Sequence, residues 1–276
     1  MKVALLQLNV SDDPLTNLDI TVALVREAAA KGARFVLTPE VTNCLSTSRK
    51  HQNSVLQLED DDITLRALRA EAASLGIWLL IGSLGLKTGD ADGRFANRSF
   101  LIGPDAEVVA TYDKIHMFDV DVTPEETYRE SDGYRPGDRA SLGAAPFGSV
   151  GLTICYDLRF PALHGALARA GASILTVPAA FSPVTGAAHW HSLLRARAIE
   201  TGCFVLAPAQ TGEHHSARHK TRKTYGHSLV VDPWGAVQMD AGTEPGVYMT
   251  DLDMDKVAQA RRRVPSLANA RKFNGP

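Results

Sequence analysis

The chain has 276 residues, of which 45% are hydrophobic and 22% charged, and its formal net charge is −2. These are ordinary globular values, which exclude disordered and fibrous classes, and the charge gives no sign of a nucleic-acid or membrane surface. The sequence contains no stretch of about 18 uninterrupted apolar residues, so no transmembrane helix is predicted. The three cysteines are widely spaced and odd in number, which argues against a disulfide framework and favours a reducing cytoplasm.

The first half of the chain alternates strand-sized apolar runs with helical patterns. The runs predict strands at 3–10, 35–39, 77–84, 99–103 and 107–113. Between the first two strands, Asp13 can cap a helix, Pro14 suits its first turn and Gly32 can end it. Its expected core face consists of Leu18, Val22, Val25 and Ala29. A second helical pattern covers 62–75.

The second half repeats this alternation. Strands are predicted within 151–157, 173–181 and 203–210, and helices at 161–170 and 186–201. On the last helix, Trp190 is expected to face the core, and Arg197 shares that apolar stripe and so needs a partner. Turn sequences then predict closing hairpins. The pattern indicates an α/β layered fold with mixed sheets, as one domain over 1–265 followed by a tail at 266–276.

One long connection, at 116–148, is mostly polar, contains prolines and glycines, and lacks clear periodicity. Long irregular connections in compact domains are usually functional or mobile. This one follows directly on a predicted strand that ends near Lys114.

Three strand ends carry reactive groups: Glu40, Lys114 and Cys155. Taken singly, the first two are most simply surface charges and the third a packed thiol. Together they supply a base, a cation for a developing oxyanion and a nucleophile, which thiol-based amide hydrolysis requires. No Cys–His arrangement competes strongly, because the spacing of His116 from Lys114 indicates only a shared strand face.

The residues around these three groups resemble a known family. "LTPEVTNCL", "YDKIHMFDVDV" and "GLTICYDLRFP", in that order, are similar to the three signatures of the nitrilase superfamily of carbon–nitrogen hydrolases, and the resemblance covers about 1–265. It implies a four-layer α-β-β-α sandwich and no metal or organic cofactor. It also implies that Glu40 is the general base, Lys114 the cation at the tetrahedral intermediate and Cys155 the acylated nucleophile. The backbone N–H of Tyr156 would complete the oxyanion hole.

A second glutamate is typical of the family in the loop after the lysine. Here "TYRESDGYRPGD" offers Glu130, which would hold Lys114 and the nitrogen side of the substrate. Glu125 and Glu126 are rivals, but the local context favours Glu130.

Within the superfamily, "AFSPVTGAAHWHSLLRARAIETGCFVLAPAQTG" and "TYGHSLVVDPWG" most resemble the Nit-type branch, whose members are deaminated-glutathione amidases and ω-amidases acting on α-ketoglutaramate. The amino-acid sequence of these segments favours the deaminated-glutathione amidases. Both substrates carry carboxylates, which require a basic or hydroxylic pocket. The candidates for substrate binding are Tyr156, Arg159, His116 and Thr185. Arg159 has an alternative role in an ion pair with Asp157 or Glu40.

Other readings stay open at this point. A nitrile or N-carbamoyl substrate is possible within the superfamily, and a non-catalytic scaffold with the same fold is a different class. The expected partners are a small-molecule amide and a second copy of the chain, in a homodimer or a higher homo-oligomer that the family implies.

The histidine-rich stretch at 214–223 is interpreted as a solvated loop, or else as a lid contacting an anionic substrate. His189 and His191 lie on different helix faces and do not form a metal pair.

Overall fold

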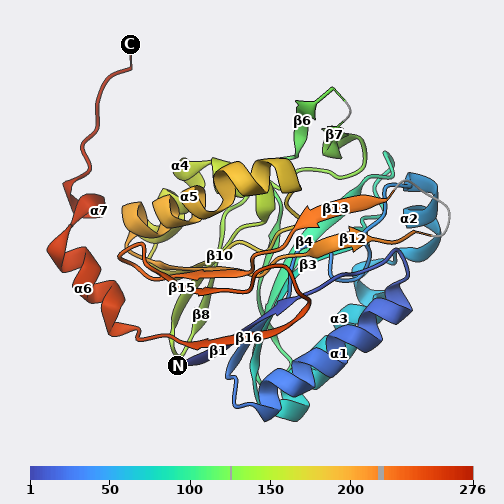
Figure 1. The fold of residues 1–276 in the computed structure, drawn as a ribbon, viewed down its shortest axis with the longest axis horizontal. Helices are drawn as coiled ribbons and strands as arrows, with labels where there is room; N and C mark the ends of the chain where they lie inside the picture. The colour runs from blue at the N-terminus through green and yellow to red at the C-terminus, as the bar shows by residue number, and fades with distance from the viewer. Residues whose placement is uncertain (125, 217–220, 276) are drawn as a thin grey trace.

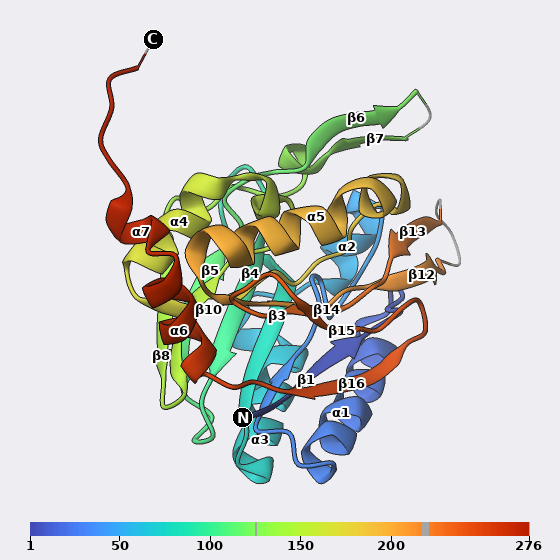
Figure 2. The ribbon, with the colours of Figure 1, turned by 60° about the vertical axis from the view of Figure 1, so that its left-hand side comes forward.

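The computed structural model describes residues 1–124, 126–216 and 221–275. Its main strands form two six-stranded sheets that lie between two pairs of helices (Figure 1 and Figure 2). Across the first sheet the order is β16 (Gly246–Asp251), β1 (Lys2–Gln7), β2 (Phe35–Leu37), β3 (Trp78–Lys87), β4 (Phe95–Ile102) and β5 (Val108–Asp113). Across the second it is β15 (Val237–Asp240), β14 (Leu229–Val231), β11 (Phe204–Ala207), β10 (Ala172–Thr176), β9 (Gly148–Leu152) and β8 (Ser141–Ala145).

Helices cover the outer face of each sheet. The first sheet carries α1 (Pro14–Ala30) and α3 (Ile63–Leu75), and the second carries α4 (Pro161–Arg169) and α5 (Pro183–Thr201). The alternating side chains of each strand explain the layers. On β1, Leu5 belongs to the apolar cluster that includes Leu152 of the second sheet, whereas Leu6 packs in the cluster that includes Val25 of α1. The predicted four-layer α-β-β-α sandwich is confirmed.

Both sheets are mixed, as predicted. In the first, β1, β2 and β3 are parallel and the outer neighbours are antiparallel. In the second, β9, β10 and β11 are parallel, with antiparallel neighbours on both sides. Parallel neighbours place their carboxyl ends at one edge of a sheet, where α/β proteins bind ligands. The loops after β2, β9 and β10 therefore meet at one end of the sandwich.

The remaining elements lie around this frame. They are α2 (Arg49–Val55), the hairpin of β6 (Asp119–Thr123) and β7 (Glu126–Arg129), the hairpin of β12 (Thr211–His214) and β13 (Arg222–Tyr225), α6 (Asp255–Arg263), α7 (Ser266–Asn269), and 3₁₀ turns at Glu59–Asp61, Glu130–Asp132 and Cys155–Arg159. The predicted tail begins with α7, which packs on α4 and α5, and Leu267 contacts the apolar cluster that includes residues of these helices. Beyond α7 the chain leads away from the body, and Phe273 is 90% exposed (Figure 1). Among the described residues, no helix is long and apolar enough to cross a membrane.

Two local predictions need correction. The Asp13 side chain does cap α1, but the fully buried residues of that helix are Asn17, Thr21, Val25 and Ala28. Of the predicted core face only Val25 is fully buried, whereas Leu18, Val22 and Ala29 are half-buried. Asn17 is buried because its amide bonds to Ser11 and to the carbonyl of Asn43, which satisfies its polar atoms. The connection at 116–148 is also more regular than its composition indicates, because it contains the β6–β7 hairpin and the edge strand β8.

Candidate active site

Three strand ends bring the predicted reactive groups together. Glu40 follows β2, Lys114 follows β5 directly, and Cys155 begins the 3₁₀ turn after β9. The Lys114 Nζ atom lies 2.8 Å from Glu40 Oε1. The three residues are 4%, 2% and 7% exposed, so this is a buried cluster of charges around a thiol.

The backbone at Cys155 holds the thiol at the strand end. Cys155 has φ 51°, a left-handed conformation that is uncommon for a residue with a side chain and is often found at functional sites. Its N–H donates to the carbonyl of Pro178 at 2.9 Å. Gly82 lets the neighbouring loops approach, since a Cβ there would lie 2.0 Å from Thr38 O and 2.5 Å from Pro178 Cβ. The fold therefore fixes the thiol between the loops that follow β2 and β10.

Asp157 ties the nucleophile turn to the segment after Lys114. Its side chain is fully buried and accepts hydrogen bonds from Ile154 N at 2.8 Å and from the Tyr112 hydroxyl at 2.7 Å. Its other oxygen accepts from His116 N at 3.1 Å and lies 2.7 Å from His116 Nδ1. Because these partners flank Lys114 and Cys155 in sequence, Asp157 fixes the spacing between the cation and the thiol.

The carboxylate of Glu40 is held by hydrogen bonds on both oxygens. Besides Lys114, Asn97 Nδ2 donates to Oε1 at 2.9 Å and Ala180 N donates to Oε2 at 2.8 Å. The Cys155 thiol lies close enough to this carboxylate to contribute to its pKa. Burial alone would raise the pKa of Glu40, but Lys114 and Arg222 outweigh it and lower the pKa below its ordinary value. Glu40 is therefore ionised at neutral pH.

The pKa values of Lys114 and Cys155 shift in directions that favour an ammonium ion and a neutral thiol. Burial would lower the pKa of Lys114, but the carboxylates of Glu130 and Glu40 raise it well above its ordinary value. Burial and the Glu40 carboxylate raise the pKa of the Cys155 thiol, against the opposing effect of Lys114. The resting site thus holds a thiol beside a carboxylate, and the thiol needs a base to react.

Glu130 is the second carboxylate on Lys114. Both its oxygens lie 2.9 Å from Lys114 Nζ, and Oε2 accepts from Phe118 N at 2.6 Å. Of the two rivals, Glu126 lies elsewhere on the cavity wall, where it accepts hydrogen bonds from Ser182 and Tyr128. Glu125 lies outside the described residues. The geometry thus places Glu130 against Lys114, as the sequence context indicates.

The cluster lies at the bottom of a cavity of about 820 Å³. Its wall includes Tyr156, Thr185, Tyr128 and Arg222. Within the part of the chain that the structure describes, Thr185 Oγ1 and Arg222 Nε are buried without a hydrogen-bond partner. Buried polar atoms normally have a partner. These two atoms are therefore suited to bind polar groups of a substrate.

Two of the predicted substrate-binding residues lie away from this wall. Among the described lining residues, neither Arg159 nor His116 occurs. Arg159 lies over the ring of Phe181 at 5.5 Å and donates to His189 Nδ1 at 3.2 Å, instead of pairing with Asp157 or Glu40. His116 stacks on Phe160 with ring centroids 3.5 Å apart while it contacts Asp157.

Two helix predictions are confirmed. Trp190 is fully buried and donates to the carbonyl of His227, and Arg197 finds partners in the Leu158 carbonyl and Glu200.

The interpretation of 214–223 as a solvated loop is wrong for its ends. His214 is buried at the end of β12, and Arg222 begins β13 on the cavity wall, while 217–220 lie outside the described residues.

Sequence reasoning missed several residues at the site. Asn97, on β4, donates to Glu40 and also to Glu130 at 3.4 Å. Arg222 donates to the carbonyl of Ala180 at 2.8 Å, and its guanidinium lies 5.5 Å from the centre of the Tyr128 ring. Asn97 stands in a strand with no motif around it, and the only signal for Arg222 was the basic character of its loop.

A sandwich of this kind, with a buried thiol beside a carboxylate and an ammonium, has the groups that a thiol-dependent hydrolase needs. The sequence comparison agrees: the family model described as carbon–nitrogen hydrolase matches residues 2–262. The chain belongs to this family, the carbon–nitrogen hydrolases of the nitrilase superfamily. It is an enzyme of the amidase type.

Relatives and solved structures support the assignment over the whole chain. The chain is 37% identical to a deaminated glutathione amidase of Synechocystis sp. over 96% of both chains. It is 40% identical to one of Yersinia enterocolitica over 98% of this chain and 92% of the relative. Among solved structures, the C. elegans NitFhit protein superposes with a TM-score of 0.89 at 32% identity, over 98% of this chain but only 65% of that one. A variant of the amidase from Nesterenkonia sp. AN1, with acrylamide added to its active-site cysteine, superposes with a TM-score of 0.77 at 26% identity, over 96% and 98% of the two chains.

Proposed function

We propose that this enzyme hydrolyses a small, carboxylate-bearing 2-oxo amide of the deaminated-glutathione type through an acyl intermediate on Cys155. The observation that carries the proposal is the contact of the Cys155 thiol and Lys114 with one ionised carboxylate, Glu40, at the bottom of a cavity whose wall holds Arg222. That arrangement supplies the nucleophile, the base, the cation and an anion-binding group.

In the first half-reaction, Cys155 Sγ attacks the amide carbonyl carbon while its proton passes to Glu40. The carbonyl oxygen becomes an oxyanion, stabilised by Lys114 Nζ and the backbone N–H of Tyr156. Removing a donor of this kind typically costs about 3–4 kcal/mol of transition-state stabilisation. The carbon–nitrogen bond then breaks, and the proton on Glu40 goes to the departing nitrogen, which leaves a thioester on Cys155 and a free amine.

In the second half-reaction, Glu40 takes a proton from water as the water oxygen attacks the thioester carbon. The new oxyanion occupies the same donors, the carbon–sulfur bond breaks, and the proton returns to the thiolate. Glu130 transfers no proton in either half-reaction and holds the Lys114 ammonium in place for both.

Three observations support a longer dicarboxylate substrate. The Synechocystis and Yersinia relatives are deaminated glutathione amidases. A cavity of about 820 Å³ is in the upper part of the range for ligand pockets and has room for a leaving group larger than ammonia. Arg222 contributes a guanidinium that donates to the Ala180 carbonyl, so its charge can pair with a substrate anion.

The direct test is a comparison of kcat/KM for deaminated glutathione and α-ketoglutaramate under the same conditions. We expect release of 2-oxoglutarate to be faster from deaminated glutathione. Faster turnover of α-ketoglutaramate would make the enzyme an ω-amidase, and equally weak rates on both would reject this substrate class. Turnover of nitriles or N-carbamoyl compounds alone would assign the alternative chemistry within the superfamily.

The nucleophile is tested separately from the substrate. Cys155→Ala should fold normally and lose turnover on every amide, and mass spectrometry of the native enzyme during turnover should find the acyl group on Cys155. Measurable amide hydrolysis by Cys155→Ala would reject the nucleophile assignment. A native enzyme that forms no adduct with any amide would favour a scaffold role.

Arg222→Met tests the carboxylate contact, with Lys31→Met as a control outside the cavity. Loss of a charge-assisted hydrogen bond costs about 1.5–3 kcal/mol, so kcat/KM for the dicarboxylate amide should fall about 10- to 100-fold. A neutral amide should lose much less. Lys31 is exposed, pairs with Glu27 and does not line the cavity, so its replacement should have little effect. Equal losses on charged and neutral amides would contradict the assigned role.

Assembly with a second copy of the chain is part of the same proposal. Three apolar residues are each at least 50% exposed: Val184 and Ile199 on α5, and Trp234. They provide apolar surface for a partner. Sedimentation velocity should find a dimer or a larger oligomer. A monomer at the concentrations used for assays would contradict this.

A further inference from the structure

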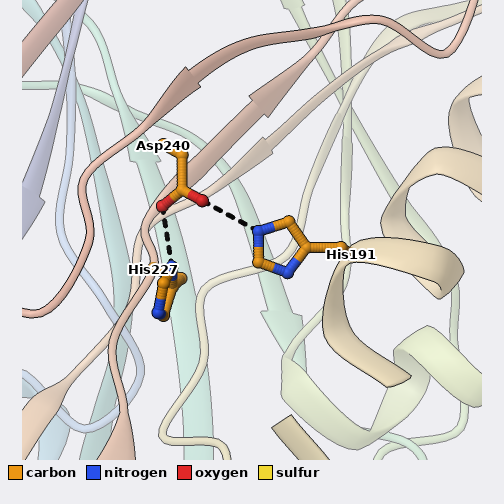
Figure 3. A group of neighbouring side chains, drawn as sticks. All are labelled: His191, His227 and Asp240. Carbon is orange, nitrogen blue, oxygen red and sulfur yellow. Dashed lines mark hydrogen bonds and ion pairs between the residues drawn. The ribbon is translucent and has the colours of Figure 1, made fainter. Parts of the chain in front are cut away.

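Outside the catalytic cavity, two imidazoles and one carboxylate converge from three different elements (Figure 3). His191 comes from α5, His227 from the segment before β14, and Asp240 from the last position of β15. Their potential ligand atoms all lie within 4.8 Å of one another. We propose that these three side chains form a binding site for Zn²⁺ or a similar divalent transition-metal ion.

The distances fit a single small ion. His191 Nε2 lies 2.8 Å from Asp240 Oδ2, and His227 Nδ1 lies 2.9 Å from Asp240 Oδ1. Both nitrogens face the same carboxylate, as Figure 3 shows. Zn²⁺ binds nitrogen and oxygen at about 2.0–2.2 Å, which in a tetrahedral site separates neighbouring ligand atoms by roughly 3.3 Å. An ion between these side chains would draw the two nitrogens and a carboxylate oxygen, which lie within 4.8 Å of one another, toward that separation. It would replace two hydrogen bonds by three coordinate bonds.

The surroundings hold the three ligands in place. Asp240 Oδ1 also accepts from Gly242 N at 2.9 Å. Both backbone polar groups of His227 are hydrogen-bonded: its N–H donates to Gly242 O, and its carbonyl accepts from Trp190 Nε1. Its ring stacks on Tyr225 with centroids 4.5 Å apart. Ligands supported in this way bind a metal without a large ordering cost.

The backbone of His227 gives an independent indication of function. It has φ 56°, and the other non-glycine residues with positive φ among those described are Val41, Ala106 and Cys155. Cys155 is the proposed nucleophile, and Val41 directly follows the proposed base. Left-handed backbone in residues with side chains costs of order 1–3 kcal/mol and clusters at active and ligand sites. At His227 this conformation directs the imidazole toward Asp240 and His191.

The donor set indicates which ion the site takes. Two neutral imidazoles and one carboxylate suit borderline ions such as Zn²⁺, whereas Mg²⁺ and Ca²⁺ prefer oxygen ligands alone. The side chains are between 24% and 35% exposed, so water can fill the remaining coordination position. Because the cluster lies outside the residues that line the catalytic cavity, the bound ion would have a structural role.

That role is to clamp α5 to the second sheet. Gly186, in the first turns of α5, packs closely against Tyr225, the residue that stacks on His227, and Thr185 beside it lines the cavity. A metal bridge from His191 to His227 and Asp240 would hold the start of α5, and with it this part of the cavity wall, against β13 and β14.

The test is calorimetric titration of metal-free enzyme with ZnCl₂, together with thermal unfolding. Cys155→Ala serves as the background, so that the catalytic thiol cannot bind the ion. We expect one Zn²⁺ per chain, and a melting temperature raised by about 5–10 °C at a hundredfold excess of free ion over Kd. In the same background, His191→Ala and Asp240→Asn should weaken binding at least tenfold. The matched control is His189→Ala, an exposed histidine two residues away on the same helix, which should bind like its parent.

Cobalt gives a second measurement that does not depend on stability. Co²⁺ bound in this site should give visible d–d absorption without a sulfur-to-metal charge-transfer band. The proposal is overturned if Zn²⁺ does not bind saturably in the Cys155→Ala background, if His191→Ala and Asp240→Asn bind it as tightly as their parent, or if His189→Ala loses it equally. Circular dichroism establishes that each variant is folded, so weakened binding reports on the ligands themselves.

Discussion

Replacing Glu40 by glutamine separates two effects of its carboxylate on the Cys155 thiol. As a base, the carboxylate accelerates the reaction; as a neighbouring negative charge, it raises the pKa of the thiol. In Glu40→Gln the thiol should therefore become more acidic while the enzyme becomes much less active. A thiol activated only by a low pKa would show the opposite relation.

The structure indicates the size of each effect. General-base catalysis typically contributes 10²- to 10⁴-fold, so kcat/KM should fall by about that factor, or about 3–5 kcal/mol in the barrier. The carboxylate accepts from Lys114 at 2.8 Å and from Ala180 N at 2.8 Å, and a glutamine can replace only one of its two oxygens. Since Glu130 still balances the Lys114 charge, the fold should survive with a loss of about 2 kcal/mol in the free energy of unfolding.

Three measurements check this prediction. Steady-state kinetics give kcat/KM, urea unfolding gives stability, and ultraviolet absorbance of the thiolate, with Cys155→Ser as the blank, gives the thiol pKa in both enzymes. The reasoning is refuted if Glu40→Gln keeps activity within tenfold of the wild type. It is also refuted if the pKa of Cys155 rises when the carboxylate is removed.

Three further predictions concern residues around this pair. Glu130→Gln should lower kcat about 10- to 100-fold with little change in KM, because a charge-assisted contact to Lys114 is lost; an unchanged kcat would reduce Glu130 to a packing role. Asp157→Asn should lower the free energy of unfolding by about 2–4 kcal/mol, because buried donors lose their acceptor, and it should also lower kcat. Urea titrations measure the stability, and a loss below about 0.5 kcal/mol would contradict the positioning role of Asp157. Burial lowers the pKa of His164 to about 4 from 6.5, so the unfolded chain takes up its proton first and about 3 kcal/mol of stability is lost as pH falls from 6.5 to 4. His164→Leu should lose less stability over that interval, and parallel acid-unfolding curves for the two proteins would contradict the assignment.

Local sequence patterns determined the layers of this protein. The alternation of apolar runs with helical periodicity predicted an α/β layered fold with mixed sheets, whereas the four-layer sandwich was implied by the family resemblance. The cap at Asp13 and the core position of Trp190 were readable because each depends on neighbours within a few turns of chain. The same patterns placed Glu40, Lys114 and Cys155 at strand ends. The resemblance of their surroundings to a family then singled them out from ordinary surface charges and packed thiols.

Only the tertiary structure decided which groups meet there. The amide of Ala180, 140 residues from Glu40, holds the proposed base, and Asn97 reaches it from β4, which β3 separates from β2, without any motif. The buried face of α1 includes the polar Asn17 beside Val25, because Asn17 finds hydrogen-bond partners on another segment, which apolar spacing does not predict.

The same holds for the proposed metal ligands. His191 and His227 each stand in an unremarkable local sequence, and only the packing of α5 against the second sheet sets their distances to Asp240. Sequence periodicity records which face of an element is apolar. The separations between polar atoms on different elements are set by how those elements pack, and these separations determine the chemistry of both sites.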